Sequence, residues 1–207
     1  MNRYYAHRVD PVLTWLADRL GLSPNTVTLL SLAAGLIATA AVFERQFAWA
    51  AVAIQLHHLL DGADGNLARA RQMTSEFGRR LDIATDQIVR FCLFGSLALV
   101  AQLPAWLGVA MMATLYLDIA LVAWVVRPCM QRHRLVRSRW KQWFMDRGLM
   151  PGFDIFTLYL IVSLCLLAGS PEAAVIMVTI LKTIDWSYRL KECWTTMRHP
   201  HRNAPER

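Results

Sequence analysis

Four aspartates are the residues of this chain whose type and spacing best suit chemistry. Asp61 and Asp64 are three residues apart and Asp82 and Asp86 are four apart, so each pair lies on one helix face. If the two helices run antiparallel, with residues 69–80 forming the corner, all four carboxylates converge on one small volume. Carboxylates this close repel each other and need a cation, and hard oxygen ligands favour Mg²⁺ or Mn²⁺. Two such ions stabilise the attacking and leaving oxygens of a phosphoryl transfer, so the spacing predicts metal-dependent phosphate chemistry.

The elements that must position these acids are helices in a membrane. The chain has 207 residues, 56% of them hydrophobic, and yet a net charge of +7, which is unusual for a soluble domain. Six apolar stretches recur, at residues 25–43, 47–60, 88–103, 105–126, 153–168 and 172–188. The second is too short to cross a bilayer, so its helix must continue through Asp61 and Asp64. An unpaired Asp at that depth costs roughly 2.5 to 3.5 kcal/mol, which makes these acids functional candidates.

We therefore predict an all-α fold, a six-helix transmembrane bundle with an N-terminal amphipathic surface helix at residues 10–20. Of the 22 Lys and Arg, 19 lie in segments on the same side as the N-terminus, and Arg45 alone lies on the other side. The positive-inside rule then places both termini and the aspartates in the cytoplasm. The single domain comprises a cytoplasmic segment (1–22), six transmembrane helices (23–190) and a cytoplasmic tail (191–207). We expect no nucleic acid partner.

Residues 61–86 carry a specific pattern: D-x-x-D-G-x-x-A-R, eight further residues, then G-x-x-x-D-x-x-x-D, with every fixed position filled. This pattern resembles the signature of the CDP-alcohol phosphatidyltransferase family. The resemblance implies transfer of a phosphate-linked alcohol from a CDP-activated donor to an acceptor hydroxyl, with release of CMP. It also implies six transmembrane helices, a cytoplasmic active site and a homodimer, and the expected location is the bacterial inner membrane.

The resemblance also implies roles for individual residues. Asp61, Asp64, Asp82 and Asp86 would hold two ions of Mg²⁺ or Mn²⁺, and Asp86 would take the proton from the acceptor hydroxyl. The residues expected to bind the donor, CDP-diacylglycerol or another CDP-alcohol, are Asp64, Gly65, Ala68, Arg69, Gly78, Asn25 and Thr28.

Physical chemistry supports these donor-binding roles and supplies alternatives. The glycines and Ala68 permit close approach of a nucleotide, although small residues also pack membrane helices together. Arg69 can donate a forked pair of hydrogen bonds to a diphosphate. Asn25 and Thr28 belong to a P-N-x-V-T run similar to the opening of the first helix in many family members, although residues of this kind also begin helices.

Other polar residues have roles that the sequence leaves open. Arg127 is the candidate for acceptor binding. It starts a basic segment (127–147) with two competing interpretations, binding of a phosphorylated acceptor and adhesion to anionic lipid headgroups. His57 and His58 either support the metal ligands or pack as polar side chains. The polar groups within spans either pair between helices or line the acceptor cavity; they are Arg90, Asp118, Lys182 and Asp185. Three further arginines match no fixed position and are expected to reach headgroups: Arg71, Arg79 and Arg80.

The function predicted is that of a phospholipid-synthesis enzyme that transfers a phosphatidyl group from CDP-diacylglycerol to an acceptor alcohol. One alternative is a CDP-aminoalcohol phosphotransferase acting on a lipid alcohol. An alternative from another class is a divalent cation transporter that uses the aspartate cluster, and a phosphatase that uses water as acceptor is a third. Glycerol 3-phosphate is a less secure acceptor, because Leu30, Ser31 and Leu32 stand where members that use it often carry an arginine.

Overall fold

The computed structural model describes residues 12–132 and 155–198, and within these ranges it contains helices and no strands. Residues 12–19 form a short helix ahead of the bundle. The remaining elements in chain order are α2 (Pro24–Phe43), α3 (Phe47–Ala70), α4 (Glu76–Val100), α5 (Ala105–Leu121), the π-helical turn η1 (Val122–Val126), α6 (Arg127–Arg132), α8 (Ile155–Leu167) and α9 (Pro171–Arg198). The prediction of an all-α fold is therefore confirmed.

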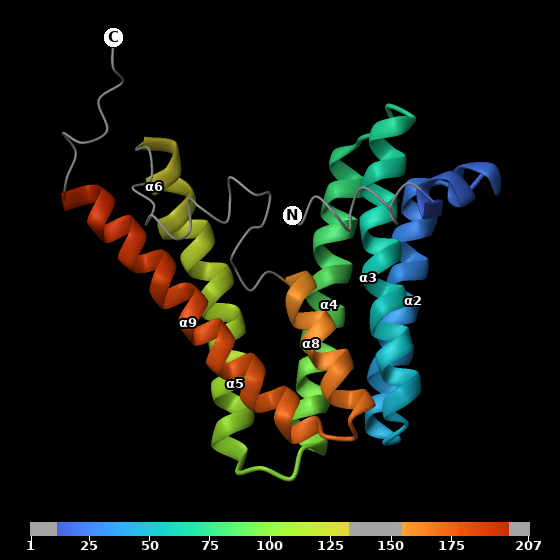
Figure 1. Ribbon diagram of the computed structural model, residues 1–207. Helices are drawn as coiled ribbons and strands as arrows, with labels where there is room; N and C mark the ends of the chain where they lie inside the picture. Colours follow the sequence, from blue (N-terminus) through green and yellow to red (C-terminus); the bar gives the residue numbers. More distant parts are fainter. Residues whose placement is uncertain (1–11, 133–154, 199–207) are drawn as a thin grey trace.

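The first three helices of the bundle form a compact group that carries the aspartates. Helix α2 packs against both α3 and α4, and short turns connect the three helices at opposite ends (Figure 1). Ser23 begins α2 by accepting a hydrogen bond from the Thr26 N–H, with Pro24 in the first helical turn. Helix α3 has 24 residues, about 36 Å at 1.5 Å per residue, so it extends well beyond its apolar first half. The acids on α3 thus stand on a continuous helix, as the sequence predicts.

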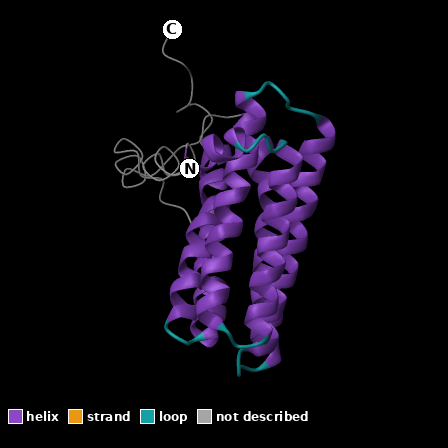
Figure 2. Cartoon of the chain, turned by 90° about the vertical axis from the view of Figure 1, so that its right-hand side faces the viewer, coloured by secondary structure: helices purple, strands orange, loops and turns teal. Residues whose placement is uncertain are grey.

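The second half of the chain closes the bundle on the other side of α4. Helix α5 packs against α4 and α9, while α8 packs against α3 and α9. In Figure 1 the paired α5 and α9 approach α4 and α8 at the lower end and diverge from them at the upper end. Viewed from the side, the helices run along one direction with short loops at the lower end (Figure 2). The acids on α3 and α4 lie in the upper half of the bundle, where these two groups of helices separate.

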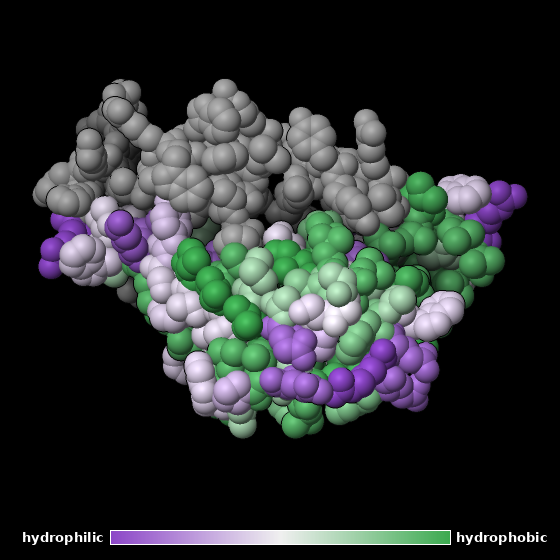
Figure 3. Space-filling view, turned by 60° about the horizontal axis from the view of Figure 1, so that its bottom comes forward, coloured by the Kyte–Doolittle hydropathy of each residue, from purple (hydrophilic) through white to green (hydrophobic). Residues whose placement is uncertain are grey.

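The core lies where α2, α3, α4, α5, α8 and α9 meet. Its largest fully buried side chains include Ile54, Phe94, Leu97, Met111 and Leu158. Many large apolar side chains nevertheless face outward, and Figure 3 shows apolar surface over much of the face in view. This is the surface expected of helices that contact lipid.

Three helices of the described ranges are both long and apolar enough to cross a membrane. They are Pro24–Phe43, Glu76–Val100 and the continuous stretch Ala105–Gln131. Helix α8 is apolar but has only 13 residues, and α3 and α9 carry several charged residues in their second halves. The chain is thus a helical membrane protein, and the predicted count of six transmembrane helices stays a prediction.

One predicted boundary differs from the structure. The corner predicted at residues 69–80 is shorter, because α3 continues to Ala70 and α4 already begins at Glu76. The difference arises because both helices extend past their apolar stretches. Helix α9 continues to Arg198, and the predicted cytoplasmic tail from residue 191 stays a prediction.

A glycine sets how closely α2 approaches α4. A Cβ atom added at Gly35 would lie 2.5 Å from both methyl carbons of Val89, a distance at which one helix must move. Overpacking of this kind typically costs about 1 to 3 kcal/mol. We expect Gly35→Ala to lower the melting temperature in detergent, followed by circular dichroism.

Two further variants control for this effect. Gly95 lies within α4, and a Cβ atom there meets nothing within 4 Å, so Gly95→Ala should hold or raise the melting temperature. Adding Val89→Ala to Gly35→Ala should recover part of the loss, because it removes the methyl groups that clash. Equal melting temperatures for Gly35→Ala and Gly95→Ala would contradict the close packing of α2 on α4.

Candidate active site

The turn between α3 and α4 reverses the chain, and both acidic helices pack against α2. Helix α3 ends at Ala70, and Gln72 adopts a positive φ of 55° in the turn that follows. Ser75 then begins α4, because its hydroxyl accepts a hydrogen bond from the Gly78 N–H at 3.0 Å. This short connection makes α3 and α4 antiparallel, and α2 packs against both of them beside the cavity.

All four aspartates converge between α3 and α4. The Asp61 carboxyl group lies within hydrogen-bonding range of the Asp86 carboxyl group and also within electrostatic range of Asp64 and Asp82. Asp64 in turn interacts with Asp82 and Asp86. Asp64 is buried, and the other three are half-buried. The structure therefore brings together the residues predicted to hold metal ions.

Thr28 of α2 fixes the orientation of Asp64. The Thr28 hydroxyl oxygen lies 2.5 Å from Asp64 Oδ2 and 3.1 Å from the Pro24 carbonyl oxygen, and Thr28 is buried. A hydroxyl donating to a carboxylate makes a stronger bond than one donating to a neutral carbonyl. Thr28 thus positions a site carboxylate, a contact between residues 36 positions apart in the chain.

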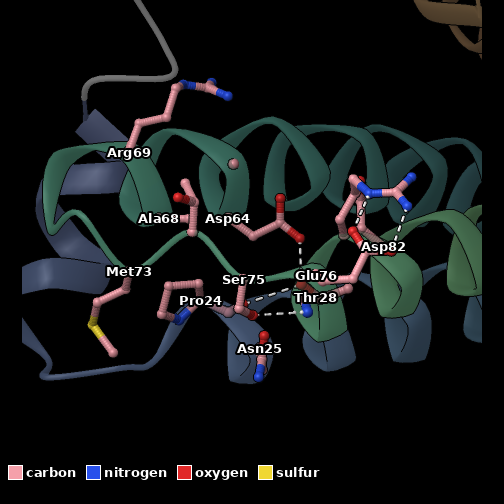
Figure 4. Close-up of a pocket in the computed structure, with 14 residues that line it drawn as sticks. Pro24, Asn25, Thr28, Asp64, Ala68, Arg69, Met73, Ser75, Glu76 and Asp82 are labelled. Carbon is pink, nitrogen blue, oxygen red and sulfur yellow. Dashed lines mark hydrogen bonds and ion pairs between the residues drawn. The ribbon is translucent and has the colours of Figure 1, made fainter.

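A cavity of about 470 Å³ opens beside the acids, between the start of α2, the second half of α3 and the start of α4. Figure 4 shows that Asp64, Thr28 and Asp82 lie near one another on this cavity, with Pro24 and Asn25 on its α2 side. Every residue predicted to bind the donor lines it: Asn25, Thr28, Asp64, Gly65, Ala68, Arg69 and Gly78. Asp82 lines it too, whereas Asp61 and Asp86 lie outside the lining.

The glycine at position 78 allows α4 to approach α2 at the cavity. A Cβ atom at Gly78 would lie 3.1 Å from Asn25 Oδ1 and 3.2 Å from Ser75 Oγ. A larger residue would therefore displace Asn25 and fill the cavity from its α4 side. At Gly65 the nearest atom to an added Cβ is the flexible end of Arg69, at 3.4 Å. Because Gly65 has no side chain, it leaves space in the cavity.

Two arginines line the cavity and differ in their bonding partners. Arg69 projects from the opposite side of α3 to Ser75 and Thr28 in Figure 4, and it donates a hydrogen bond of 2.6 Å to Asn66. No ion pair joins Arg69 to a carboxylate within the described ranges. Arg79 also lines the cavity, but Glu76 holds it through two hydrogen bonds of 2.9 and 2.7 Å. Arg69 is consequently the cavity arginine available for an anionic ligand.

Sequence reasoning missed part of this cavity. Ser75, Glu76 and Arg79 line it without matching a fixed position of the motif. Ser75 was detectable, because a serine ahead of a helix is a common start signal. Glu76 and Arg79 were harder to identify from the sequence, because their position on the cavity depends on where α4 begins.

Arg71 has a role other than the predicted contact with lipid headgroups. Its guanidinium donates to Asp18 Oδ1 at 2.7 Å, to the Asp18 carbonyl oxygen at 3.0 Å and to the Leu22 carbonyl oxygen at 2.8 Å. These bonds attach the helix at residues 12–19 to the end of α3. Arg71 therefore links the N-terminal helix to the turn between α3 and α4.

Arg127, the predicted acceptor-binding residue, lies away from this cavity. It is exposed at the start of α6, which Figure 1 places on the far side of the bundle from α2 and α3. It does not appear among the described residues that line the cavity. Residues 133–147 of the basic segment lie outside the described ranges, so the acceptor role of Arg127 stays a prediction.

Polar residues within the helices have partners inside the protein. His57 is buried and bonds to Ser31 of α2, whereas the ring of His58 packs against Phe156 with centroids 4.6 Å apart. On the other side of α4, Lys182 of α9 bonds to Asp118 of α5 at 2.7 Å. Pairing between helices therefore explains Lys182 and its carboxylate partner without a ligand.

The chemistry of the acids suits a divalent cation. Two carboxyl groups in contact, as in Asp61 and Asp86, require either a shared proton or a positive charge between them. All donor atoms in the cluster are carboxylate or hydroxyl oxygens, the ligands that Mg²⁺ and Mn²⁺ favour. In the described part of the chain, no three His, Cys, Asp or Glu side chains are already arranged as ligands around one point. The inference that a divalent cation suits this site therefore depends on the type of the donor atoms and on their convergence.

Comparison with known proteins assigns the chain to a family. Residues 21–186 match the family model for CDP-alcohol phosphatidyltransferase. The chain belongs to this family. Over 104 residues it is 40% identical to a phosphatidylinositol phosphate synthase from Streptomyces avermitilis, an alignment that covers 48% of this chain and 42% of that protein. Over 89 residues it is 36% identical to the inner membrane protein YnjF of Escherichia coli, covering 42% of this chain and 43% of YnjF. The chain thus spans about two fifths of the length of these relatives.

Solved structures show the same fold. The phosphatidylinositol phosphate synthase PgsA1 of Mycobacterium tuberculosis, in complex with manganese and citrate, matches with a TM-score of 0.59 at 18% identity. That match covers 91% of this chain and 90% of the other. The same protein with CDP-DAG bound matches with a TM-score of 0.55. The helical arrangement of the family is therefore shared along most of the chain.

The bond between Thr28 and Asp64 makes a prediction about metal affinity. Replacing Thr28 by valine keeps the shape of the side chain but removes the hydroxyl that orients Asp64. Loss of a hydrogen bond that supports a metal ligand typically weakens binding about 10- to 100-fold. We expect this loss for Mn²⁺ binding to the purified protein, measured by electron paramagnetic resonance of free Mn²⁺. Thr28→Ser should bind nearly as wild type, and an unchanged affinity in Thr28→Val would contradict the positioning role.

Proposed function

We propose that this protein is an integral membrane enzyme that transfers a phosphatidyl group from CDP-diacylglycerol to the hydroxyl of an acceptor alcohol and releases CMP. The observation that carries the proposal is the convergence of four carboxylates beside a cavity lined by the family motif. The acids alone would suit several metal-dependent reactions. Their position next to a cavity lined by small residues and an arginine favours a nucleoside diphosphate as the ligand.

In this proposal the cavity binds the CDP part of the donor. Gly65, Ala68 and Gly78 leave room for the nucleotide, and Asn25 offers its side-chain amide at the α2 wall. Arg69 binds a phosphate oxygen of the diphosphate through its guanidinium fork. Asp61, Asp64, Asp82 and Asp86 hold two ions of Mg²⁺ or Mn²⁺, which when bound neutralise charge on the attacking and leaving oxygens.

Asp86 is proposed to accept the proton of the acceptor hydroxyl. It lies one helical turn deeper in α4 than Asp82 and outside the cavity lining. A base at that position faces away from the nucleotide, on the side from which an acceptor would attack the phosphorus atom. The acceptor oxygen then bonds to phosphorus as the bond to CMP breaks, and the proton moves to Asp86.

The relatives support the choice of donor and metal. The M. tuberculosis protein with this fold has been solved with CDP-DAG bound and with manganese. At 18% identity this likeness shows the fold, so donor and metal are proposals for the present chain. A CDP-aminoalcohol donor with a lipid acceptor would use the same acids and is the main alternative within the family.

The membrane arrangement is part of the proposal. Six helices cross the bilayer, with both termini and the acids on the cytoplasmic side, and the helix at residues 12–19 lies on the membrane surface. Trp15 and Leu16 support this surface position, because they are exposed apolar side chains on the short helix. A homodimer in the bacterial inner membrane completes the proposal.

The acids provide the direct test. Asp86→Asn should lower CMP release from CDP-diacylglycerol about 100- to 10,000-fold, the usual contribution of a general base. Asp82→Asn should abolish release by removing a metal ligand. A chelator should also abolish release in the wild type, and added Mg²⁺ or Mn²⁺ should restore it. The measurement is CMP formed by purified protein in mixed micelles with a panel of alcohols.

Glu44→Gln is the matched control, because Glu44 is a carboxylate at the opposite end of the bundle. It should retain wild-type release. Unchanged CMP formation in both aspartate variants and with chelator would overturn the proposal. Reconstituted vesicles separate the transporter alternative, which requires Mn²⁺ flux in the absence of nucleotide. CMP formed without an added alcohol would instead indicate a phosphatase.

A further inference from the structure

One arginine joins the ends of the N-terminal helix and of α3. The N-terminal helix, residues 12–19, closes when the Leu22 N–H donates to the Ala17 carbonyl oxygen. Gly21, at a positive φ of 67°, donates to the Asp18 carbonyl oxygen, which completes a Schellman motif. The guanidinium of Arg71 donates to the carbonyl oxygens of Asp18 and Leu22 in this same turn. The cation therefore lies at the C-terminal end of a second helix, where the helix dipole favours positive charge.

The turn that follows Arg71 forms one wall of the cavity beside the acids. Residues 73–75 line that cavity and are exposed. Within the described part of the chain, the side chains of residues 72–74 make no hydrogen bond to another element. Gln72 holds a positive φ of 55°, a conformation that a residue with a Cβ atom keeps only where its surroundings impose it. The turn therefore depends on its ends for its shape, and Arg71 attaches one end to another helix.

The N-terminal helix is itself fixed against the segments that hold a site carboxylate. Figure 1 shows this helix, in blue, at the upper end of α2. Ala17 is buried in a small apolar cluster that includes Val27 of α2 and Ala63 of α3. Val27 directly precedes Thr28, and Ala63 directly precedes Asp64. The helix thus packs on the backbone beside the bond between Thr28 and Asp64, and it offers a fixed attachment point for the turn.

Arg71 acts on the cavity without entering it. It is not among the described residues that line the cavity. Its ion pair with Asp18 would hold it only weakly, because the Asp18 side chain is 57% exposed. The two bonds to backbone carbonyl oxygens do not depend on a mobile side chain, so they fix the guanidinium more firmly.

We propose that Arg71 is a positioning residue of the donor site, and that through it the N-terminal helix sets the shape of the cavity wall at residues 72–75. This inference rests on the proposed function and deepens it. Binding of CDP-diacylglycerol then depends on a helix that carries no residue of the family motif. Without the link the exposed turn is free to move, and the donor must order it on binding, which lowers affinity.

Arg71→Gln should raise KM for CDP-diacylglycerol about 2- to 30-fold, the range for residues that modulate a site without touching its ligand. The acceptor KM, and kcat at saturating donor, should stay unchanged, because the turn lies away from Asp86. The measurement is CMP release by purified protein, with the alcohol of the panel that reacts fastest. Arg80→Gln is the matched control: it removes the same charge from the start of α4, where Arg80 is exposed and outside the cavity lining. It should leave both KM values unchanged.

Asp18→Asn separates positioning from direct contact with the donor. If Arg71 bound the donor phosphates, losing Asp18 would release its guanidinium, and the donor KM would hold or fall. Positioning requires the donor KM to rise, and the double variant to be no worse than Arg71→Gln alone. A donor KM that holds or falls in Asp18→Asn would therefore overturn the inference.

A second measurement needs no turnover. Backbone hydrogen exchange of residues 72–78 should be faster in Arg71→Gln than in the wild type or Arg80→Gln. A lower melting temperature of Arg71→Gln with an unchanged donor KM would show a purely structural link and overturn the inference. A wild type that releases no CMP with any alcohol would instead overturn the proposed function.

Discussion

Mutual repulsion among four carboxylates is the constraint on which the rest of this structure depends. Acids held this close in a half-buried position are stable only if something positive joins them or if their neighbours fix them in place. The short turn at residues 71–75 brings the two acidic helices together, and Thr28 reaches across from α2 to hold Asp64. Gly35 lets α2 pack tightly enough on α4 for this to happen. The fold thus holds these carboxyl groups so close that a shared proton or a bound cation must relieve their repulsion.

The bundle offers two different environments on the two sides of these acids. Toward α2, the surface is an open cavity with small residues, one arginine free of ion pairs and the capped start of α4. Toward α8, the surroundings are closed and aromatic, with single polar atoms of His57 and Tyr159 left unpaired. Asp86 lies between these two environments, outside the lining of the open cavity.

Much of this arrangement follows from residues close together in the sequence. The helix faces of the two aspartate pairs, the continuation of α3 past Leu60 and the small residues of the cavity floor all follow from local spacing and composition. The contacts that position them do not, because Thr28 is 36 residues from Asp64, Ser31 is 26 from His57 and Arg71 is 53 from Asp18. Such pairs depend on how helices pack, which no single stretch of sequence contains. For the same reason, no local sequence pattern distinguishes Tyr159 from the rest of its apolar segment.

The buried acids of this protein fall into two classes that reveal which of them await a ligand. Asp118 and Asp185 each have a cationic side chain at 2.7 Å, Lys182 for the first and Arg189 for the second. These two pairs balance their own charge and connect within the α5 and α9 region, so they need nothing from outside. Asp61, Asp64 and Asp82 lie in a comparable setting, yet no Lys or Arg of the described residues forms an ion pair with them. The chain carries 22 basic residues, and it pairs its structural acids while leaving these three unpaired. This contrast supports the proposal that cations from solution bind there.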